Sequence, residues 1–224
     1  TLLVAKRLRE AVLRGYYRDI RVLKRRLTFR GVEEIIAHAE QKIYHTLYAP
    51  GPDQYQDCGT LLHDLTEAHR ILLEEHEGLF KDELERFILK VRTFGFYFAS
   101  LDIRQESGKH QLVWERILEQ WNHKFPWFKE HAFLNAAAET QIDRLLSINH
   151  LLDPADFDDP LVRETLQTFK AIAEIQRNNG ELGCHRYIIS NCGSAVQVAQ
   201  VLALARLTIA SADAQGLPGQ VPLD

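Results

Sequence analysis

The sequence contains no methionine, and its first residue is Thr1. The chain therefore does not begin at a native start codon, and we expect it to be an internal fragment of a longer protein. No charged segment followed by an apolar stretch stands at its beginning, so the pattern of a secretory leader is missing as well.

Cysteine is scarce, and no long apolar run occurs. The three cysteines, Cys58, Cys184 and Cys192, are odd in number and form no Cys-x-x-Cys pair, which favours reduced thiols in a cytoplasmic protein. No stretch approaches the roughly 20 apolar residues that span a bilayer, so we expect no membrane partner. Cys184, His185 and Cys192 match no zinc-binding spacing, and buried thiols are the simpler interpretation.

Several catalytic motifs are also missing. The sequence has no glycine-rich phosphate loop, no Gly-x-Ser-x-Gly turn and no His-Glu-x-x-His pair. These absences argue against a nucleotide-binding loop, a serine hydrolase and a zinc protease of the usual kinds. Any chemistry must come from other residues.

The charge is low overall and uneven along the chain. A net charge of −4 gives no general attraction to nucleic acid. Residues 1–30, however, hold ten Lys and Arg against two acidic residues, a local charge of +8 that leaves −12 for the remainder. A basic helix face of this kind either pairs with the acidic remainder or binds an anionic partner. No aromatic residues interleave these charges in a stacking pattern, which favours the first interpretation.

The apolar periodicity predicts helices over most of the chain, because hydrophobic residues recur at steps of three and four. The predicted helices cover about residues 4–27, 32–47, 60–77, 80–92, 110–121, 133–152, 160–178 and 194–209. An aromatic patch around Pro126 interrupts this pattern, and residues 216–224 are predicted to be a loop.

Two short apolar runs, near residues 96–102 and 186–190, predict strands. Some eighty residues with helical patterns separate them, so they should be parallel neighbours rather than a hairpin. The predicted fold class is mainly α: a helix-rich fragment of an α/β barrel of the TIM type, with about two short parallel strands. We expect residues 1–93 to form an N-terminal helical region and residues 94–224 a partial barrel segment.

A dense polar cluster follows the first predicted strand: Asp102, Arg104, Gln105, Glu106 and Ser107. Ligands bind at the carboxyl ends of parallel strands, so this cluster is the candidate site. The guanidinium of Arg104 could bind a phosphate or a carboxylate through two parallel hydrogen bonds. A structural ion-pair network with Asp102 and Glu106 is the equally supported alternative.

The same cluster resembles phosphoenolpyruvate carboxylase. The resemblance rests on Val91-Arg92-x-Phe94-Gly95 and on Leu101-Asp102-Ile103-Arg104-Gln105-Glu106-Ser107-x-x-His110, with support from Tyr187-Ile188-Ile189-Ser190. It implies a mostly helical protein built around an eight-stranded α/β barrel. It further implies a carbon–carbon lyase that converts phosphoenolpyruvate and bicarbonate to oxaloacetate and phosphate, which replenishes the tricarboxylic acid cycle.

The resemblance also implies a cofactor, an assembly and one residue role. The cofactor would be Mg²⁺ or Mn²⁺, and the full-length protein would be a cytoplasmic homotetramer. The arginine of the motif carries over to Arg104 in a phosphate-binding role, with Asp102, Gln105, Glu106 and Ser107 as supporting residues. The family's metal-binding carboxylates and glycine-rich arginine loops have no counterpart in this chain, so the fragment alone should be inactive, with no catalytic or metal-binding residues of its own.

A second hypothesis belongs to a different class. The chain would be a non-catalytic helical module that uses the basic face of residues 1–30 to hold an anionic partner. Binding that weakens steeply with salt would distinguish this hypothesis from the enzymatic one.

Overall fold

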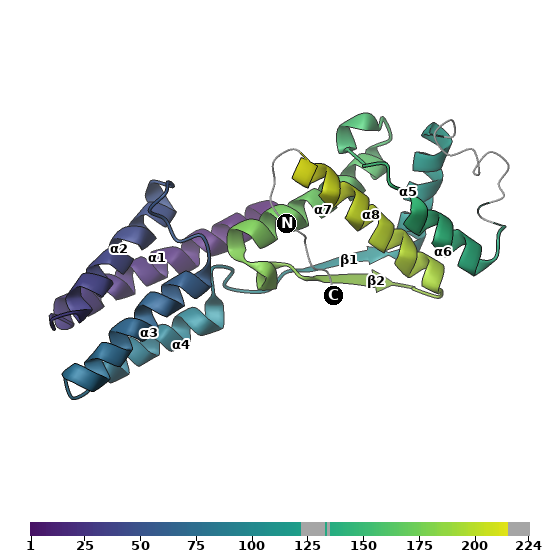
Figure 1. Ribbon diagram of the computed structural model, residues 1–224. Coiled ribbons are helices and arrows are strands. Elements are labelled where there is room, and N and C mark those ends of the chain that lie inside the picture. Colours follow the sequence, from purple (N-terminus) through teal and green to yellow (C-terminus); the bar gives the residue numbers. More distant parts are fainter. Residues whose placement is uncertain (122–132, 134, 215–224) are drawn as a thin grey trace. The chain divides into compact units, whose positions relative to one another are not determined.

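The computed structural model of the chain describes residues 1–121, 133 and 135–214 (Figure 1). It is mainly helical and contains one two-stranded parallel sheet. The α-helices are α1 (Leu2–Arg26), α2 (Val32–Tyr48), α3 (Cys58–Glu75), α4 (Lys81–Phe94), α5 (Ser107–Gln120), α6 (Ala138–Ser147), α7 (Pro160–Asn179) and α8 (Ala195–Ala214). The strands are β1 (Asp102–Glu106) and β2 (Arg186–Ser190), and two 3-10 turns, η2 (Pro154–Asp156) and η3 (Glu181–Gly183), complete the list.

The mainly helical fold class and the two short parallel strands are confirmed. The helix expected over residues 133–152 is shorter than predicted, since α6 covers only Ala138–Ser147. The predictions for the patch around Pro126 and for the loop at 216–224 lie outside the described residues. Within the described part, no helix has both the length and the hydrophobicity needed to cross a bilayer.

The chain divides into two compact units. Unit 1 comprises residues 1–101 and 175–184, and unit 2 comprises residues 102–174 and 185–224. Helix α7 contributes to both, because its last residues pack with unit 1 and its earlier ones with unit 2.

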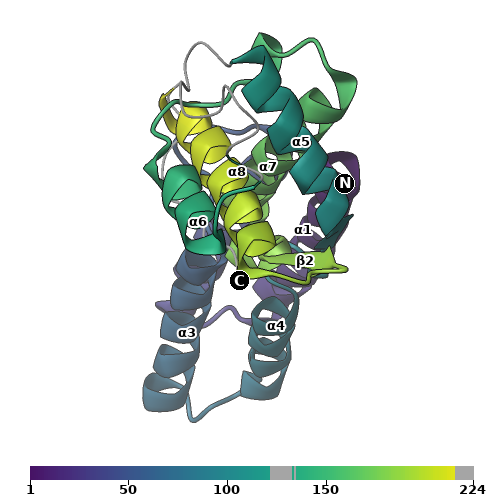
Figure 2. The ribbon, with the colours of Figure 1, turned by 90° about the vertical axis from the view of Figure 1, so that its right-hand side faces the viewer.

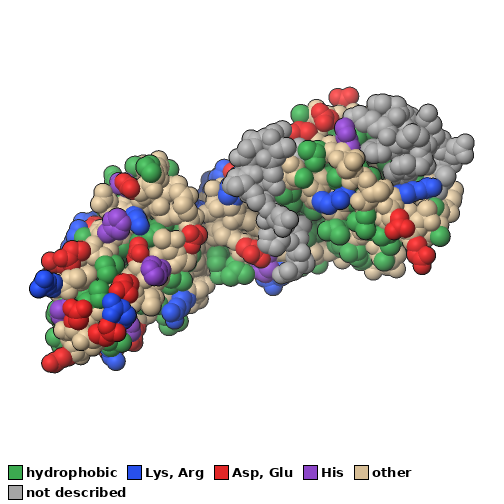
Figure 3. Space-filling model, viewed as in Figure 1, with side chains coloured by type: hydrophobic (Ala, Val, Ile, Leu, Met, Phe, Trp, Pro, Cys, Tyr) green, Lys and Arg blue, Asp and Glu red, His purple; other side chains and the backbone are tan. Residues whose placement is uncertain are grey.

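Unit 1 is a bundle of α1 to α4 joined by the end of α7. Helix α1 packs against α2 and α4, and α3 packs against α2 and α4. The apolar residues of α1 recur every three or four positions, so they line one face and are buried: Leu13, Tyr16, Ile20 and Leu23. Figure 3 shows positive and negative side chains interspersed over the outer face of these helices.

A buried tyrosine fixes the end of α4. The hydroxyl of Tyr16 donates to the carbonyl oxygen of Gly95 at 2.7 Å. Gly95 has a φ of +47°, and a Cβ there would lie 2.5 Å from the ring of Tyr97. Only glycine fits this turn without displacing the ring. The hydrogen bond from Tyr16 and the glycine turn together fix the direction of the chain after α4.

The strand predicted over residues 96–102 is wrong in position, because β1 covers Asp102–Glu106. The aromatic run forms a turn packed on unit 1 instead: Phe96 is buried, and the rings of Phe94 and Phe98 stack 5.3 Å apart. Phe98 itself has a φ of +64°, which no ladder residue adopts. Burial of the aromatics against the bundle thus competes with strand formation, and the polar motif becomes the strand.

Unit 2 is built on the sheet. Strands β1 and β2 pair in parallel, with Asp102 opposite Arg186 and Glu106 opposite Ser190. Figures 1 and 2 show α5, α6 and α8 on one side of this sheet. The covered side carries Tyr187, whose ring stacks on that of Phe169 at 5.2 Å. The indole of Trp114 on α5 donates to the carbonyl oxygen of Gln200 at 2.9 Å and so joins α5 to α8.

Candidate functional site

The polar motif alternates across the sheet because successive side chains of a strand point to opposite faces. Ile103 points to the helix-covered face, where it is buried, while Arg104 and Glu106 on the other face are exposed. Strand β2 alternates in the same way, with Arg186, Ile188 and Ser190 exposed. The face that the described helices leave uncovered thus carries a row of charged and polar groups, interrupted by the exposed Ile188.

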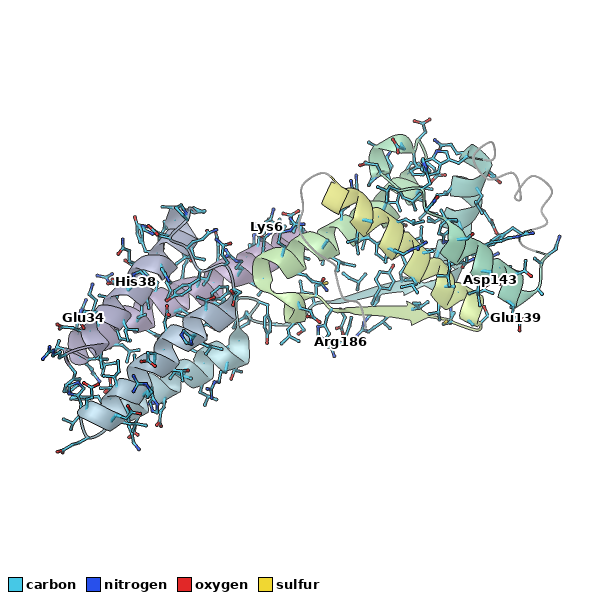
Figure 4. All side chains as sticks on the ribbon, viewed as in Figure 1. Lys6, Glu34, His38, Glu139, Asp143 and Arg186 are labelled. Carbon is cyan, nitrogen blue, oxygen red and sulfur yellow. The ribbon has the colours of Figure 1, made fainter. Side chains whose placement is uncertain are left out.

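Asp102 lies between two guanidinium groups on this face. Its Oδ1 is 3.0 Å from Nε of Arg186, and its Oδ2 is 3.7 Å from Nη2 of Arg104. The closer contact lacks hydrogen-bond geometry, and Oδ1 has no hydrogen-bond partner among the described residues. Figure 4 shows Arg186 at the start of β2, on the side of the sheet away from α8.

Arg104 is the less constrained of the two arginines. Its side chain is 74% exposed, and its ion pair with Asp102 is long. Exposed pairs of this kind contribute about 0–1 kcal/mol, so the guanidinium loses little when it turns toward a ligand. Its planar group offers two parallel N–H donors to a phosphate or a carboxylate. The geometry therefore suits anion binding better than a rigid ion-pair network.

The other end of β1 is tied to the loop that follows β2. The hydroxyl of Ser107 donates to the carbonyl oxygen of Asn191 at 2.8 Å. The amide of Asn191 donates to Oε1 of Glu106 at 3.3 Å, and Gln105 Oε1 accepts from the backbone N–H of Glu106 at 3.3 Å. Ser107 and Glu106 thus join the end of β1 to the loop after β2, whereas the contact of Gln105 stays within β1.

His110, the last residue of the motif, lies beneath the sheet. It is fully buried on α5, and its Nε2 is 2.7 Å from the hydroxyl of Tyr187. Burial lowers the pKa of His110 to about 4 and raises the pKa of Tyr187. The imidazole is therefore neutral near pH 7, and its contact joins α5 to β2 behind the polar face.

A comparison with known families identifies the family of this chain. A family model described as phosphoenolpyruvate carboxylase matches residues 4–223, nearly the whole chain. The chain belongs to the phosphoenolpyruvate carboxylase family.

Individual relatives agree with this assignment. A phosphoenolpyruvate carboxylase of Gloeobacter violaceus is 29% identical over 199 residues, which are 80% of this chain and 20% of that protein. A phosphoenolpyruvate carboxylase of a Synechococcus strain is 31% identical over 72% of this chain, which is 14% of that protein. One of a Synechocystis strain is also 31% identical, over 70% of this chain and 15% of that protein. The chain thus spans a seventh to a fifth of the relatives it matches.

The described residues do not offer a metal site of their own. They contain no group of three His, Cys, Asp or Glu side chains placed to hold a metal ion. Of the carboxylates on the polar face, Asp102 already faces two arginines, and Glu106 accepts from Asn191. The arrangement fits an anion better than a divalent cation.

The sequence predicted part of this site. The structure brings Asp102 and Arg104 together in an ion pair, as the alternative interpretation expected, and leaves Arg104 exposed. Arg186 and Asn191 were not among the candidate residues. The register of the parallel strands is what places Arg186 opposite Asp102, and that register could be inferred only once the first strand was correctly positioned.

Proposed function

We propose that this chain is the part of a phosphoenolpyruvate carboxylase that carries a phosphate-binding arginine, Arg104. The whole enzyme would join phosphoenolpyruvate and bicarbonate to give oxaloacetate and phosphate. Membership of the family and the exposed guanidinium on an uncovered sheet face support this proposal. The single observation that carries it is the exposure of Arg104 within the family motif.

In this proposal, Arg104 donates two hydrogen bonds to the substrate phosphate and stabilises the charge that develops during phosphate transfer. Asp102 limits the rotation of Arg104 through the 3.7 Å contact, and Arg186 holds Asp102 in turn. Gln105, Glu106 and Ser107 support the strand ends. None of them is assigned a proton transfer.

The proposal extends to the whole protein. The enzyme would use Mg²⁺ or Mn²⁺, held by residues outside this chain, since the family's metal-binding carboxylates have no counterpart in the sequence. Further strands would continue β1 and β2 into an α/β barrel, with residues 1–93 as a helical region and residues 94–224 as part of the barrel. The assembly would be a cytoplasmic homotetramer, and this chain alone would be inactive.

Substitution of Arg104 in the longer enzyme tests the proposal. Arg104→Ala should lower kcat/KM for phosphoenolpyruvate by roughly 30- to 900-fold, which corresponds to about 2–4 kcal/mol of transition-state stabilisation. Steady-state kinetics measure this value.

Arg86→Ala is the matched control, since Arg86 is an exposed arginine on α4, outside both the polar face and the family motif. It should leave kcat/KM within about twofold of the parent enzyme. An Arg104→Ala enzyme with undiminished kcat/KM would contradict the phosphate-binding role.

A further inference from the structure

Four arginines form a stripe along the outer face of α1. They follow one another at steps of seven, four and seven residues: Arg7, Arg14, Arg18 and Arg25. At 100° per residue these positions fall within about 40° of one another and extend over about 27 Å of helix. All four side chains are exposed. We call these four residues the arginine stripe.

The stripe is distinct from the other basic residues of α1. Arg21 and Lys24 pair with Glu40, and Arg26 pairs with Glu83, so these charges are compensated within unit 1.

Among the described residues, Arg7, Arg18 and Arg25 make no ion pair or hydrogen bond, and Arg14 has only a 3.6 Å contact with Glu10. The expectation that the basic face pairs with the acidic remainder therefore holds for one side of α1 and fails along the stripe.

An aromatic cluster borders the stripe. Tyr17 of α1 contacts both Tyr44 and Tyr48 of α2, with ring centroids 5.9 and 6.3 Å away, and the latter two rings are 5.2 Å apart. Arg21 stacks over the ring of Tyr17 at 5.6 Å. Tyr44 and Tyr48 are 43% and 52% exposed. The sequence shows no stacking pattern of aromatics among the basic residues, because two of the three tyrosines, Tyr44 and Tyr48, come from the second helix.

Stripe and cluster meet in an open groove of about 450 Å³. Its lining is Ala11, Arg14, Tyr17, Arg18 and Tyr48. Arginine and tyrosine are the residues that contribute most to binding energy at protein interfaces, since both combine a large contact area with hydrogen-bond donors. The volume suits one aromatic or large apolar side chain.

We propose that the arginine stripe and this groove bind an acidic polypeptide segment, which packs one aromatic side chain against Tyr17 and Tyr48 in the groove. The steps of seven, four and seven residues match carboxylates spaced in the same way on a helical segment. The proposed binding site shares no residue with the proposed phosphate site, since its residues belong to unit 1 and Arg104 belongs to unit 2.

Nucleic acid fits this surface less well. A continuous phosphate backbone along α1 would meet the exposed carboxylate of Glu10 within the stripe. It would also pass beside Glu40, whose side chain is 18% exposed and pairs with Arg21 and Lys24. A polypeptide can place its carboxylates at the arginines and leave neutral residues opposite the two glutamates.

Fluorescence anisotropy of the 224-residue chain tests the proposal. The probe is a labelled glutamate-rich peptide as long as the stripe, about 18 residues, with one central phenylalanine. A second peptide replaces the phenylalanine by serine, and an oligothymidylate of equal charge is the nucleic-acid arm. We expect the phenylalanine peptide to bind tightest at low salt and to weaken as salt rises.

Variants locate the binding. The double variant Arg14→Glu/Arg18→Glu should weaken binding of the phenylalanine peptide at least about 10-fold, and Arg14→Ala/Arg18→Ala should weaken it less. The matched charge reversal Lys81→Glu/Arg92→Glu on α4 should change it by no more than about twofold. Tyr48→Ala should abolish the preference for phenylalanine over serine. Circular dichroism confirms that each variant is folded.

Three outcomes would overturn the proposal. The first is the absence of peptide binding at low salt. The second is equal weakening by the stripe and control double variants, which would indicate attraction by net charge alone. The third is tighter binding of oligothymidylate than of the phenylalanine peptide, which would assign the surface to nucleic acid. None of these results depends on carboxylase activity.

Discussion

Asp102 contacts the guanidinium of Arg104 and still leaves that group exposed to solvent. Its two oxygens face different arginines, and Arg186 is the closer at 3.0 Å. Arg104 is left with a contact of 3.7 Å and an exposed guanidinium. A carboxylate shared in this way limits where Arg104 points without neutralising it completely. The proposed phosphate site and the ion pair, which were alternatives at the level of sequence, are therefore compatible with each other.

His110 leads to a prediction about stability and pH. Burial lowers its pKa in the folded state to about 4, whereas an unfolded histidine titrates near 6.5. The unfolded chain therefore binds more protons between these values. The stabilising effect of the neutral imidazole is complete above about pH 6.5 and is lost as the pH falls toward 4.

Urea unfolding of wild type and His110→Gln at pH 7 and pH 5 measures this effect. The difference between the two pH values should be larger for wild type, by roughly 1–2 kcal/mol, because glutamine can keep the hydrogen bond to Tyr187 but cannot titrate. The remaining histidines are common to both proteins and act as the internal control. An identical pH dependence in the two proteins would show that His110 does not titrate in this range.

At the scale of elements, the start of α3 depends on one cap. The carboxylate of Asp57 accepts hydrogen bonds from the backbone N–H of Thr60 at 2.9 Å and from its hydroxyl at 2.8 Å. Burial alone would raise the pKa of Asp57, but the hydrogen bonds from Thr60 and Gly59 outweigh it and lower the pKa. The cap therefore acts as an ionised carboxylate.

Asp57→Ala should destabilise unit 1 by about 1 kcal/mol, because the first turn of α3 loses its acceptor. Asp53→Ala in the same loop is the control, since Asp53 is exposed and makes no hydrogen bond or ion pair among the described residues. It should stay within about 0.5 kcal/mol of wild type. Urea unfolding at pH 7 compares the two, and equal stabilities would argue against the cap.

The helices could be predicted from the sequence, whereas the position of the first strand could not. Regular spacing of apolar residues located the helices, since a helix must bury one continuous face. The first strand was misplaced because an aromatic run is apolar whether it enters a sheet or a turn. Phe96 is buried in the core of unit 1, and its neighbour Gly95 has a positive φ. Both facts depend on packing partners that lie far away in the sequence.

At the scale of the whole molecule, unit 1 is completed by residues from far along the chain. The amide of Asn179 at the end of α7 donates to the carbonyl oxygen of Ala5 at 3.0 Å, across 174 residues of sequence. Arg9 donates to the carbonyl oxygen of Asn178 at 2.8 Å. The first helix is thus held by a segment that follows most of unit 2 in the sequence.

Asn179→Ala should lower the stability of unit 1 by about 1–3 kcal/mol, since a buried donor and its acceptor both lose a partner. Asn178→Ala is the control, because that side chain is exposed and only its backbone oxygen is used. Hydrogen exchange of the α1 backbone amides is the measurement, and exchange should accelerate only in Asn179→Ala. Equal exchange in both variants would indicate that the end of α7 does not stabilise α1.

The sequence by itself determined the family and the mainly helical character, and it predicted Arg104 as the candidate binding residue. Local patterns suffice for these, because helical periodicity and a contiguous motif depend on neighbours in the sequence. Only the tertiary structure decided that the motif is itself the strand, that Arg186 faces Asp102, and that tyrosines of α2 border the arginines of α1. Each of these depends on strand register or helix packing, which join residues that the sequence keeps apart.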